Sequence, residues 1–240
     1  HLELKPDIVA LDVGCATGFP LFELAQMYGP SSRFVGIDLW TGALQRARRR
    51  RTIVNLPNVA LVECDGAAMP FDDASFDLIT SNLGLNNFER PEIVIAECFR
   101  VARPGAIIAL TTNLYGHMRE AYALFERILS ERGRHDVAKR LAEQELHRGT
   151  TAGFQSLLTR AGFEIRKSMG SSFPLRFADG SAMLRHGLVK FFLDGWRPVV
   201  GPDMEEEFFV TAEERLNEIA AGSGLEYSIP MLYLEGRRPE

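Results

Sequence analysis

The chain has 240 residues, of which 46% are hydrophobic and 25% charged, a composition typical of a globular protein and unlike that of a disordered one. Its net charge of −5 gives no electrostatic reason to expect a nucleic-acid partner. The three cysteines form no CxxC pair, so we expect neither a disulfide framework nor a metal site, and the cytoplasm fits best. No apolar run approaches the roughly 20 residues that cross a bilayer, so no membrane partner is expected. Because the chain begins at His1 and not at methionine, we expect either missing N-terminal sequence or a cloning remnant.

Strands and helices are predicted to alternate through the first half of the chain. Apolar runs of strand length are followed by turns or by apolar residues at helical spacing. The expected strands are 8–13, 33–38, 59–63, 76–81 and 106–112, with a turn at Pro104 and Gly105, and the expected helices are 19–28, 41–51 (capped by Thr41) and 92–102. This alternation predicts parallel βαβ units and a doubly wound sheet.

The second half is less regular. The sequence predicts one or two helices over 113–149 with a break near Gly133, a helix at 154–161, a strand at 163–169, helices around 182–193 and 212–221, and a closing strand at 227–234. We therefore expect a core in three pieces and two helical insertions that act as caps. The core pieces are 1–112, 151–170 and 223–240, and the insertions are 113–150 and 171–222, the second rich in aromatic residues.

A glycine-rich loop, Asp-Val-Gly-Cys-Ala-Thr-Gly at 12–18, follows the first strand. Gly14 and Gly18 permit positive φ and let a ligand approach the backbone closely. The loop amides and the start of the next helix offer donors to the amino-acid carboxylate of S-adenosylmethionine (SAM), helped by the helix dipole. Asp38 ends the second strand about 20 residues after Gly18, where a carboxylate accepts hydrogen bonds from both ribose hydroxyls.

Further polar residues follow the third and fourth strands. Asp65 is placed to accept from an adenine amino group, and Asn82 lies at the carboxyl edge of the sheet, where ligands of open α/β sheets bind. The order and spacing predict a SAM site made of Asp12, Gly14, Cys15, Ala16, Gly18, Asp38, Leu39, Asp65, Gly66, Ala67 and Asn82. A dinucleotide site is disfavoured, because the motif G-x-G-x-x-G would need glycine where the chain has Ala16 and Phe19.

These segments resemble the class I SAM-dependent methyltransferases. The loop at 12–18 is similar to their D-x-G-C-G-T-G loop, with Ala16 in place of the middle glycine, and its extra methyl group should slightly crowd the cofactor. The segments 35–38, 65–71, 76–79 and 99–105 resemble later motifs of the family, and 82–88 is similar to the F-G-L-R-N-V stretch of ubiquinone and menaquinone C-methyltransferases. The resemblance implies a Rossmann-like α/β fold with a seven-stranded, mostly parallel sheet, helices on both faces and an antiparallel last strand.

Residues that bind the methyl acceptor are expected after the fourth strand. Methyl transfer is an in-line displacement on a sulfonium, for which the protein mainly orients and desolvates the reactants. His117 and His186 are candidate general bases. The alternative for each is a purely structural histidine at the surface or in the core. Candidate acceptor contacts are Asn86, Tyr115, Phe191 and Trp196, and the aromatic residues of 171–222 either form an apolar lid or pack the core of that insertion.

The sequence therefore predicts a SAM-dependent methyltransferase for a small, apolar or aromatic acceptor, acting as a monomer or homodimer. Two alternatives stay open: a catalytically silent SAM-binding or scaffold protein, and a protein or RNA methyltransferase. Five arginines between positions 46 and 51 could suggest a nucleic-acid site, but they end a helix, where basic residues favour the dipole and face water.

Overall fold

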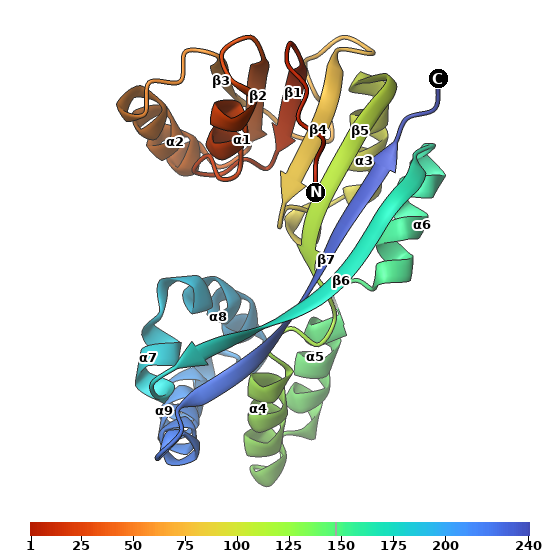
Figure 1. Ribbon diagram of the computed structural model, residues 1–240. Helices are drawn as coiled ribbons and strands as arrows, with labels where there is room; N and C mark the ends of the chain where they lie inside the picture. Colours follow the sequence, from red (N-terminus) through yellow and green to blue (C-terminus); the bar gives the residue numbers. More distant parts are fainter. Residues whose placement is uncertain (147) are drawn as a thin grey trace. The chain divides into compact units, whose positions relative to one another are not determined.

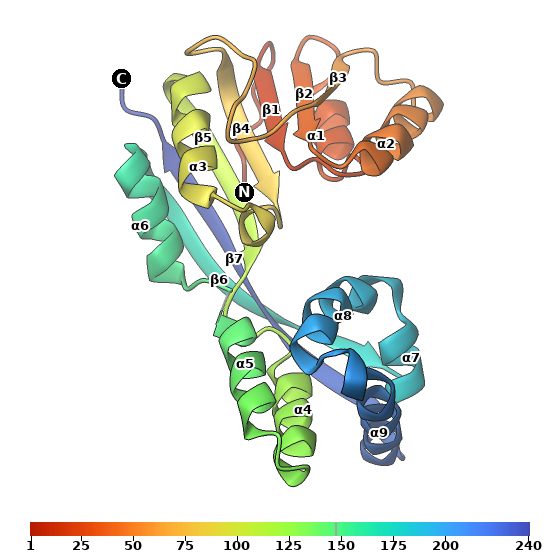
Figure 2. The same cartoon turned by 180° about the vertical axis from the view of Figure 1, so that it is seen from behind.

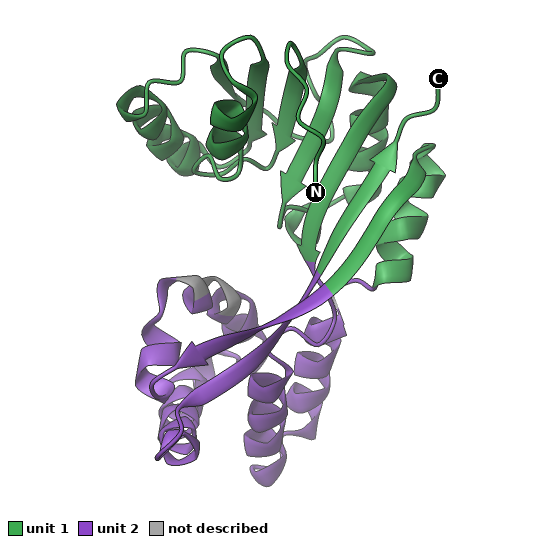
Figure 3. Cartoon of the chain, viewed as in Figure 1, with its two compact units in different colours: residues 1–112, 151–170, 232–240 green, residues 113–150, 171–231 purple. Residues whose placement is uncertain are grey.

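The computed structural model describes residues 1–146 and 148–240, except for the side chains of Leu188, Phe191 and Phe192. These residues divide into two compact units (Figure 3). Unit 1 contains residues 1–112, 151–170 and 232–240, and unit 2 contains residues 113–150 and 171–231. None of the described helices is both long enough and apolar enough to cross a membrane.

A mixed sheet organises unit 1. Its seven described strands lie in the order β3-β2-β1-β4-β5-β7-β6 (Figure 1). They are β1 (Val9–Val13), β2 (Arg33–Asp38), β3 (Val59–Glu63), β4 (Phe76–Asn82), β5 (Ala102–Asn113), β6 (Glu164–Phe177) and β7 (Leu225–Arg237). The strands β1 to β5 pair in parallel. β7 is antiparallel to β5, because Gly105 N bonds Arg238 O whereas Leu114 N bonds Pro230 O. The predicted mostly parallel sheet with an antiparallel last strand is confirmed.

Helices cover both faces of this sheet. Figures 1 and 2 show α1 (Leu21–Tyr28) and α2 (Thr41–Ile53) on one face, and α3 (Pro91–Val101) and α6 (Thr151–Ala161) on the other. Leu21, Phe22 and Leu44 of the first pair pack on a core that includes Phe34 of β2. Because central parallel strands are buried on both sides, they are continuous apolar runs, which is why the sequence marks β1 and β4 so clearly.

Unit 2 consists of helices packed around parts of β6 and β7. Its described helices are α4 (Arg119–Glu131), α5 (His135–Leu146), α7 (Gly180–Arg185), α8 (Gly187–Val200) and α9 (Pro202–Ala220). Phe177, Trp196 and Phe208 lie in its core. The ring of Phe125 packs edge-on against Trp196, with centroids 5.1 Å apart, and against Phe208, at 5.3 Å. These aromatic residues of the second insertion therefore form the core of unit 2, as the alternative to a lid predicted.

Several expected elements have different ends in the structure; for example, the helix expected around 212–221 begins at Pro202 as α9, and two others show the cause. The helix expected over 182–193 is two helices, α7 and α8, because the backbone at His186 is extended, with φ −65° and ψ 132°. The strand expected over 163–169 continues to Phe177 as β6. In both cases the ends depend on packing within unit 2, which a local pattern of apolar residues does not contain.

Two expected turn and cap residues also have other roles. The turn expected at Pro104 and Gly105 lies inside β5, where Gly105 has a φ of 79°. Thr41 is not the cap of α2, since the cap residue is Trp40 and Thr41 Oγ1 donates to Glu63 Oε1 at 2.7 Å. Neither difference moves the ends of the neighbouring strands β2 and β3, whose predicted bounds are confirmed.

Candidate cofactor site

The loop between β1 and α1 is held on the end of β2. The N–H groups of Gly14 and Cys15 both donate to Ile37 O, at 2.9 and 3.0 Å. Gly14 has a φ of 75° and Gly18 a φ of 97°, in the left-handed region that favours glycine. A Cβ atom on Gly18 would overlap the ring of Phe22. The two glycines therefore permit both the turn and its close packing on α1.

Asp38 connects this loop to the start of α2. Its Oδ2 accepts from Ala16 N, and its Oδ1 accepts from Trp40 N, each at 2.8 Å. A carboxylate oxygen has two lone pairs, so both oxygens retain acceptor capacity for the hydroxyls of a ribose. Asp38 thus fixes two loops at the carboxyl edge of the sheet and offers acceptors at the same place.

The loop amides have a different role from the one that the sequence suggested. The N–H groups of Gly14, Cys15, Ala16 and Gly18 all donate to acceptors of the chain itself: Ile37 O for the first two, the Asp38 carboxylate, and Cys15 O. In this conformation they hold the loop instead of pointing to a ligand carboxylate. The anionic end of SAM would therefore need donors other than these four.

Asp12 is a buried carboxyl group at the end of β1. It is 1% exposed, its Oδ1 accepts from Thr80 Oγ1 at 2.6 Å, and its Oδ2 has no hydrogen-bond partner among the described residues. Burial raises the pKa of Asp12 to about 7, the Thr80 hydrogen bond opposes this shift, and the charge of Asp38 adds to it. A buried carboxylate with an open oxygen fits the cationic amino group of SAM, because that group would supply both the missing bond and a compensating charge.

The loops after β3 and β4 complete this edge of the sheet. Asp65 Oδ1 accepts from Ala67 N at 2.8 Å, and Arg90 lies 3.9 Å from Asp65 Oδ2. Asn82 Oδ1 accepts from Thr111 Oγ1 at 2.5 Å. Since β1 to β4 are adjacent and parallel, their ends bring the loop 12–18, Asp38, Asp65 and Asn82 to one edge, and the donors and acceptors present there fit an adenosyl cofactor.

Side chains of β4 hold the loop in a way that the sequence analysis missed. Besides the bond from Thr80 to Asp12, Ser81 Oγ donates to Val13 O at 2.7 Å, and both β4 residues are buried. The ring of Phe88 would lie 3.5 Å from a Cβ atom on Gly14. Adjacent hydroxyl residues at the end of an otherwise apolar strand are the signal that could have identified the first two.

Ala16 has a φ of 43°, which is unfavourable for a residue with a side chain. Replacing Ala16 with glycine should relieve about 1 kcal/mol of backbone strain, partly offset by the greater freedom of glycine in the unfolded chain. We expect the free energy of unfolding to change by less than about 1 kcal/mol and SAM to bind up to about fivefold more tightly, since the predicted crowding of the cofactor by the methyl group is removed. Urea titration and calorimetry measure the two quantities, and weaker SAM binding by the glycine variant would refute the crowding.

The two candidate bases, His117 and His186, lie in different environments. His117 is 3% exposed, and burial together with the charge of Arg148 lowers its pKa to about 3. Such an imidazole is a poor proton acceptor near neutral pH, because its charged form is strongly disfavoured. His186 is exposed between α7 and α8, with its ring 5.4 Å from that of Phe177. A catalytic histidine therefore stays a prediction, which the burial of His117 disfavours.

The candidate acceptor contacts are dispersed. Asn86 lies in the short helix η1 (Leu85–Asn87) after β4, and Tyr115 is 49% exposed in unit 2. Trp196 is 2% exposed and donates to Tyr122 Oη at 2.7 Å, so it packs in the core of unit 2, which disfavours the predicted contact with the acceptor. The side chain of Phe191, like His147, lies outside the described residues.

Comparison with known protein families gives a match within unit 1. Residues 11–110 match a family profile described as a methyltransferase domain. The demethylmenaquinone methyltransferase of Lactococcus lactis subsp. lactis is 28% identical over 186 residues, which cover 71% of this chain and 73% of that protein. The chain spans about half the length of several other demethylmenaquinone methyltransferases that it matches, between 48% and 56%.

Solved structures share the fold. A [4+2]-cyclase is 19% identical with a TM-score of 0.61, covering 98% of this chain and 77% of its own. A SAM-dependent methyltransferase from Aquifex aeolicus is 20% identical with a TM-score of 0.55, covering 70% of this chain and 78% of its own. At these identities the likeness concerns the fold, whereas the profile and the sequence relatives concern the family. With the loop and the three aspartates in the expected places, residues 11–110 are similar to the methyltransferase domain of the class I SAM-dependent methyltransferases.

Proposed function

We propose that this chain transfers the methyl group of SAM to a small apolar or aromatic acceptor of the quinone class. The observation that carries the proposal is the meeting of Asp12, Asp38 and Asp65 at the ends of three adjacent strands, β1, β2 and β3. The choice of acceptor is supported by the sequence relatives that are demethylmenaquinone methyltransferases. We therefore take the reduced form of a demethylmenaquinone, the quinol, as the first acceptor to test, because its electron-rich ring attacks the electrophilic methyl group and a proton leaves the methylated carbon.

Each aspartate has a distinct part in holding SAM in this proposal. Asp38 accepts from the ribose hydroxyls, Asp12 accepts from the amino group through its open Oδ2, and Asp65 accepts from the adenine amino group. When bound, SAM supplies an electrophilic methyl group. The residues of the chain orient it and exclude water, and we propose Asn86, just beyond β4, as an acceptor contact.

No histidine is assigned as a base in this proposal, because His117 has a pKa of about 3 and His186 is exposed. A proton released by the acceptor would pass to water. The expected consequence is a rate that follows the ionisation of the acceptor itself, and a pH profile that shifts between acceptors of different pKa would show this.

Labelled SAM tests the proposal against its alternatives. The intact chain is incubated with methyl-labelled SAM and either a demethylmenaquinone kept reduced to its quinol by added reductant, bulk protein or RNA. We expect label only in the quinone fraction, and none when Asp38 is replaced by alanine. Label in protein or RNA instead would favour that class of acceptor.

A SAM-binding protein without methyl transfer is the second candidate. It is favoured by one observation, that a [4+2]-cyclase shares the fold with a TM-score of 0.61. Tight SAM binding without transfer of label to a demethylmenaquinone, protein or RNA would support this candidate and contradict the proposed one.

A further inference from the structure

Four arginines of α2 form a basic surface on unit 1. The helix buries Ala43, Leu44 and Ala47 against the core, and the outward face is exposed. Arg46, Arg49 and Arg50 share that face at helical spacing, and Arg48 is exposed beside them. We call Arg46, Arg48, Arg49 and Arg50 the arginine surface. They lie on α2, the helix that packs against the edge strand β3.

The arginine surface has no carboxylate partner among the residues that the structure describes. Arg46 lies over the ring of Trp40, 5.9 Å from its centroid, and Arg50 lies 5.5 Å from the centroid of Phe22. The acid at the end of the neighbouring strand, Glu63, accepts from Thr41 instead. In a chain whose net charge is −5, this face therefore carries a local excess of positive charge.

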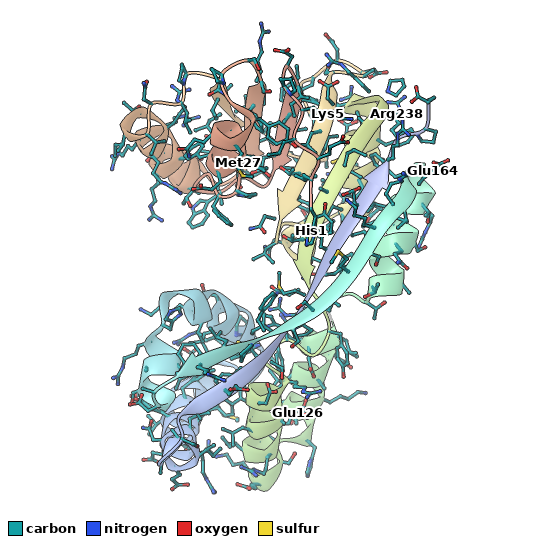
Figure 4. The ribbon with its side chains drawn as sticks, in the orientation of Figure 1. His1, Lys5, Met27, Glu126, Glu164 and Arg238 are labelled. Atoms are coloured by element: carbon teal, nitrogen blue, oxygen red, sulfur yellow. The ribbon has the colours of Figure 1, made fainter. Side chains whose placement is uncertain are left out.

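Exposed apolar side chains continue the same surface. Ile53 follows Arg46 by two helical turns and is 82% exposed, and the next residue, Val54, is 41% exposed. Met27, labelled in Figure 4, is 61% exposed near the end of α1. The ends of the two helices are linked, because Asn58 Nδ2, in the loop after α2, donates to Gly29 O at 3.2 Å. The arginines and Ile53 thus lie on one helix, and Val54 follows its end.

We propose that the arginine surface, with Ile53 and Val54, docks on an anionic lipid bilayer. Arginine binds anionic headgroups through charge and hydrogen bonds, and exposed aliphatic side chains enter the interface below them. A nucleic acid would satisfy the arginines but leave the apolar side chains in water, which is why lipid is the favoured partner. The expectation that the chain has no membrane partner came from the absence of a spanning run, and docking at the surface needs none.

Vesicle cosedimentation tests this proposal on the intact chain. The chain is mixed with vesicles of phosphatidylcholine alone, or of phosphatidylcholine and phosphatidylglycerol, without SAM and without acceptor. We expect binding only to the anionic vesicles and its loss at high salt, because salt screens exposed charges. Since neither SAM nor acceptor is present, this result is independent of the proposed methyl transfer.

Two double variants, each with two fewer positive charges than the unchanged chain, show whether the arginine surface is the part that binds the vesicles. The double variant Arg48→Gln/Arg49→Gln should bind anionic vesicles about 25-fold more weakly, at about fivefold for each arginine removed. The matched control Arg160→Gln/Arg166→Gln removes the same charge from exposed positions on α6 and β6 and should bind as the unchanged chain does. Replacing Ile53 with serine should weaken binding a few-fold at the same charge.

Three results would overturn the proposal: equal binding to both kinds of vesicle, no binding to either, or equal losses in the two double variants. Binding of an RNA oligonucleotide that only Arg48→Gln/Arg49→Gln abolishes, without vesicle binding, would assign the surface to nucleic acid instead. Circular dichroism and SAM calorimetry show whether each variant is folded; Arg50 is kept in these variants because its Nη1 donates to Thr17 O of the loop at 3.4 Å.

Discussion

Replacing Asp12 with asparagine should stabilise the protein above pH 7. The carboxyl group is 1% exposed, and burial raises its pKa to about 7. In the unfolded chain its pKa is about 3.9. A folded-state pKa that is raised in this way gives stability that is complete below the unfolded value and is lost as pH rises through the folded value. Asparagine does not titrate, so the variant avoids that loss, which we estimate at about 2–4 kcal/mol at pH 8.

Urea unfolding at pH 5 and pH 8 measures this effect. We expect the free energy of unfolding of Asp12→Asn to exceed that of the unchanged chain by much less at pH 5 than at pH 8, because the buried carboxyl is protonated at the lower pH. The control Asp72→Asn alters an exposed carboxylate and should change stability little at either pH. A loss of stability at pH 8, or a difference that does not depend on pH, would contradict the account.

The same substitution should weaken SAM binding, because the amide lacks the charge that attracts the amino group of SAM. A charged hydrogen bond contributes about 1.5–3 kcal/mol, which corresponds to an affinity loss of about tenfold to a hundredfold. For the unchanged chain, SAM affinity should rise with pH up to about pH 7 as Asp12 ionises, and fall again above about pH 8, where the amino group of SAM loses its proton. Asp12 is thus expected to lower the free energy of unfolding above pH 7 and to strengthen the binding of SAM.

Replacing Asp38 with alanine is the second change with a large expected effect, about tenfold to a hundredfold on SAM affinity. The variant loses the acceptors for the ribose, and it also loses the bonds to Ala16 N and Trp40 N that hold two loops of the site. Calorimetry measures this loss of SAM affinity. It does not show whether the missing ribose acceptors or the missing loop bonds cause the loss, so a second experiment is needed.

Two ligands that differ in one hydroxyl distinguish a direct bond from Asp38 to the ribose from an effect of Asp38 on the loops. S-adenosylhomocysteine and its 2′-deoxy analogue differ in one ribose hydroxyl, so the unchanged chain should bind the deoxy compound more weakly. If Asp38 accepts from that hydroxyl, the alanine variant should bind both compounds equally. If the variant still distinguishes them as strongly as the unchanged chain does, Asp38 only shapes the loops and its ribose role is refuted.

The sequence predicts the central part of the fold well because each signal there is local. The strands β2 and β3 begin and end at the predicted residues, since a buried parallel strand is a short apolar run between turns. The strand β6 was predicted too short, and one predicted helix is divided at His186. Those ends depend on strand pairing and on the packing of unit 2, which involve residues far apart in the sequence.

The site, like the fold, has features that the sequence predicts and features that depend on residues far apart in the chain. Parallel strand order alone brings the loop 12–18, Asp38 and Asp65 to one edge, so their meeting could be predicted. The environment of Asp12 could not, because it depends on Thr80, 68 residues away. Nor could the role of Trp196, since apolar spacing does not distinguish a residue that packs a core from one that lines a binding site.

Calorimetry of the intact chain with SAM at pH 8 tests the central claim most directly. The account predicts one SAM bound per chain with a Kd of about 1 μM to 1 mM. It also predicts that Asp38→Ala weakens this binding at least about tenfold, whereas Asp72→Asn leaves it unchanged. Absence of SAM binding by the folded, intact chain, or equal affinity in the Asp38 variant, would contradict it.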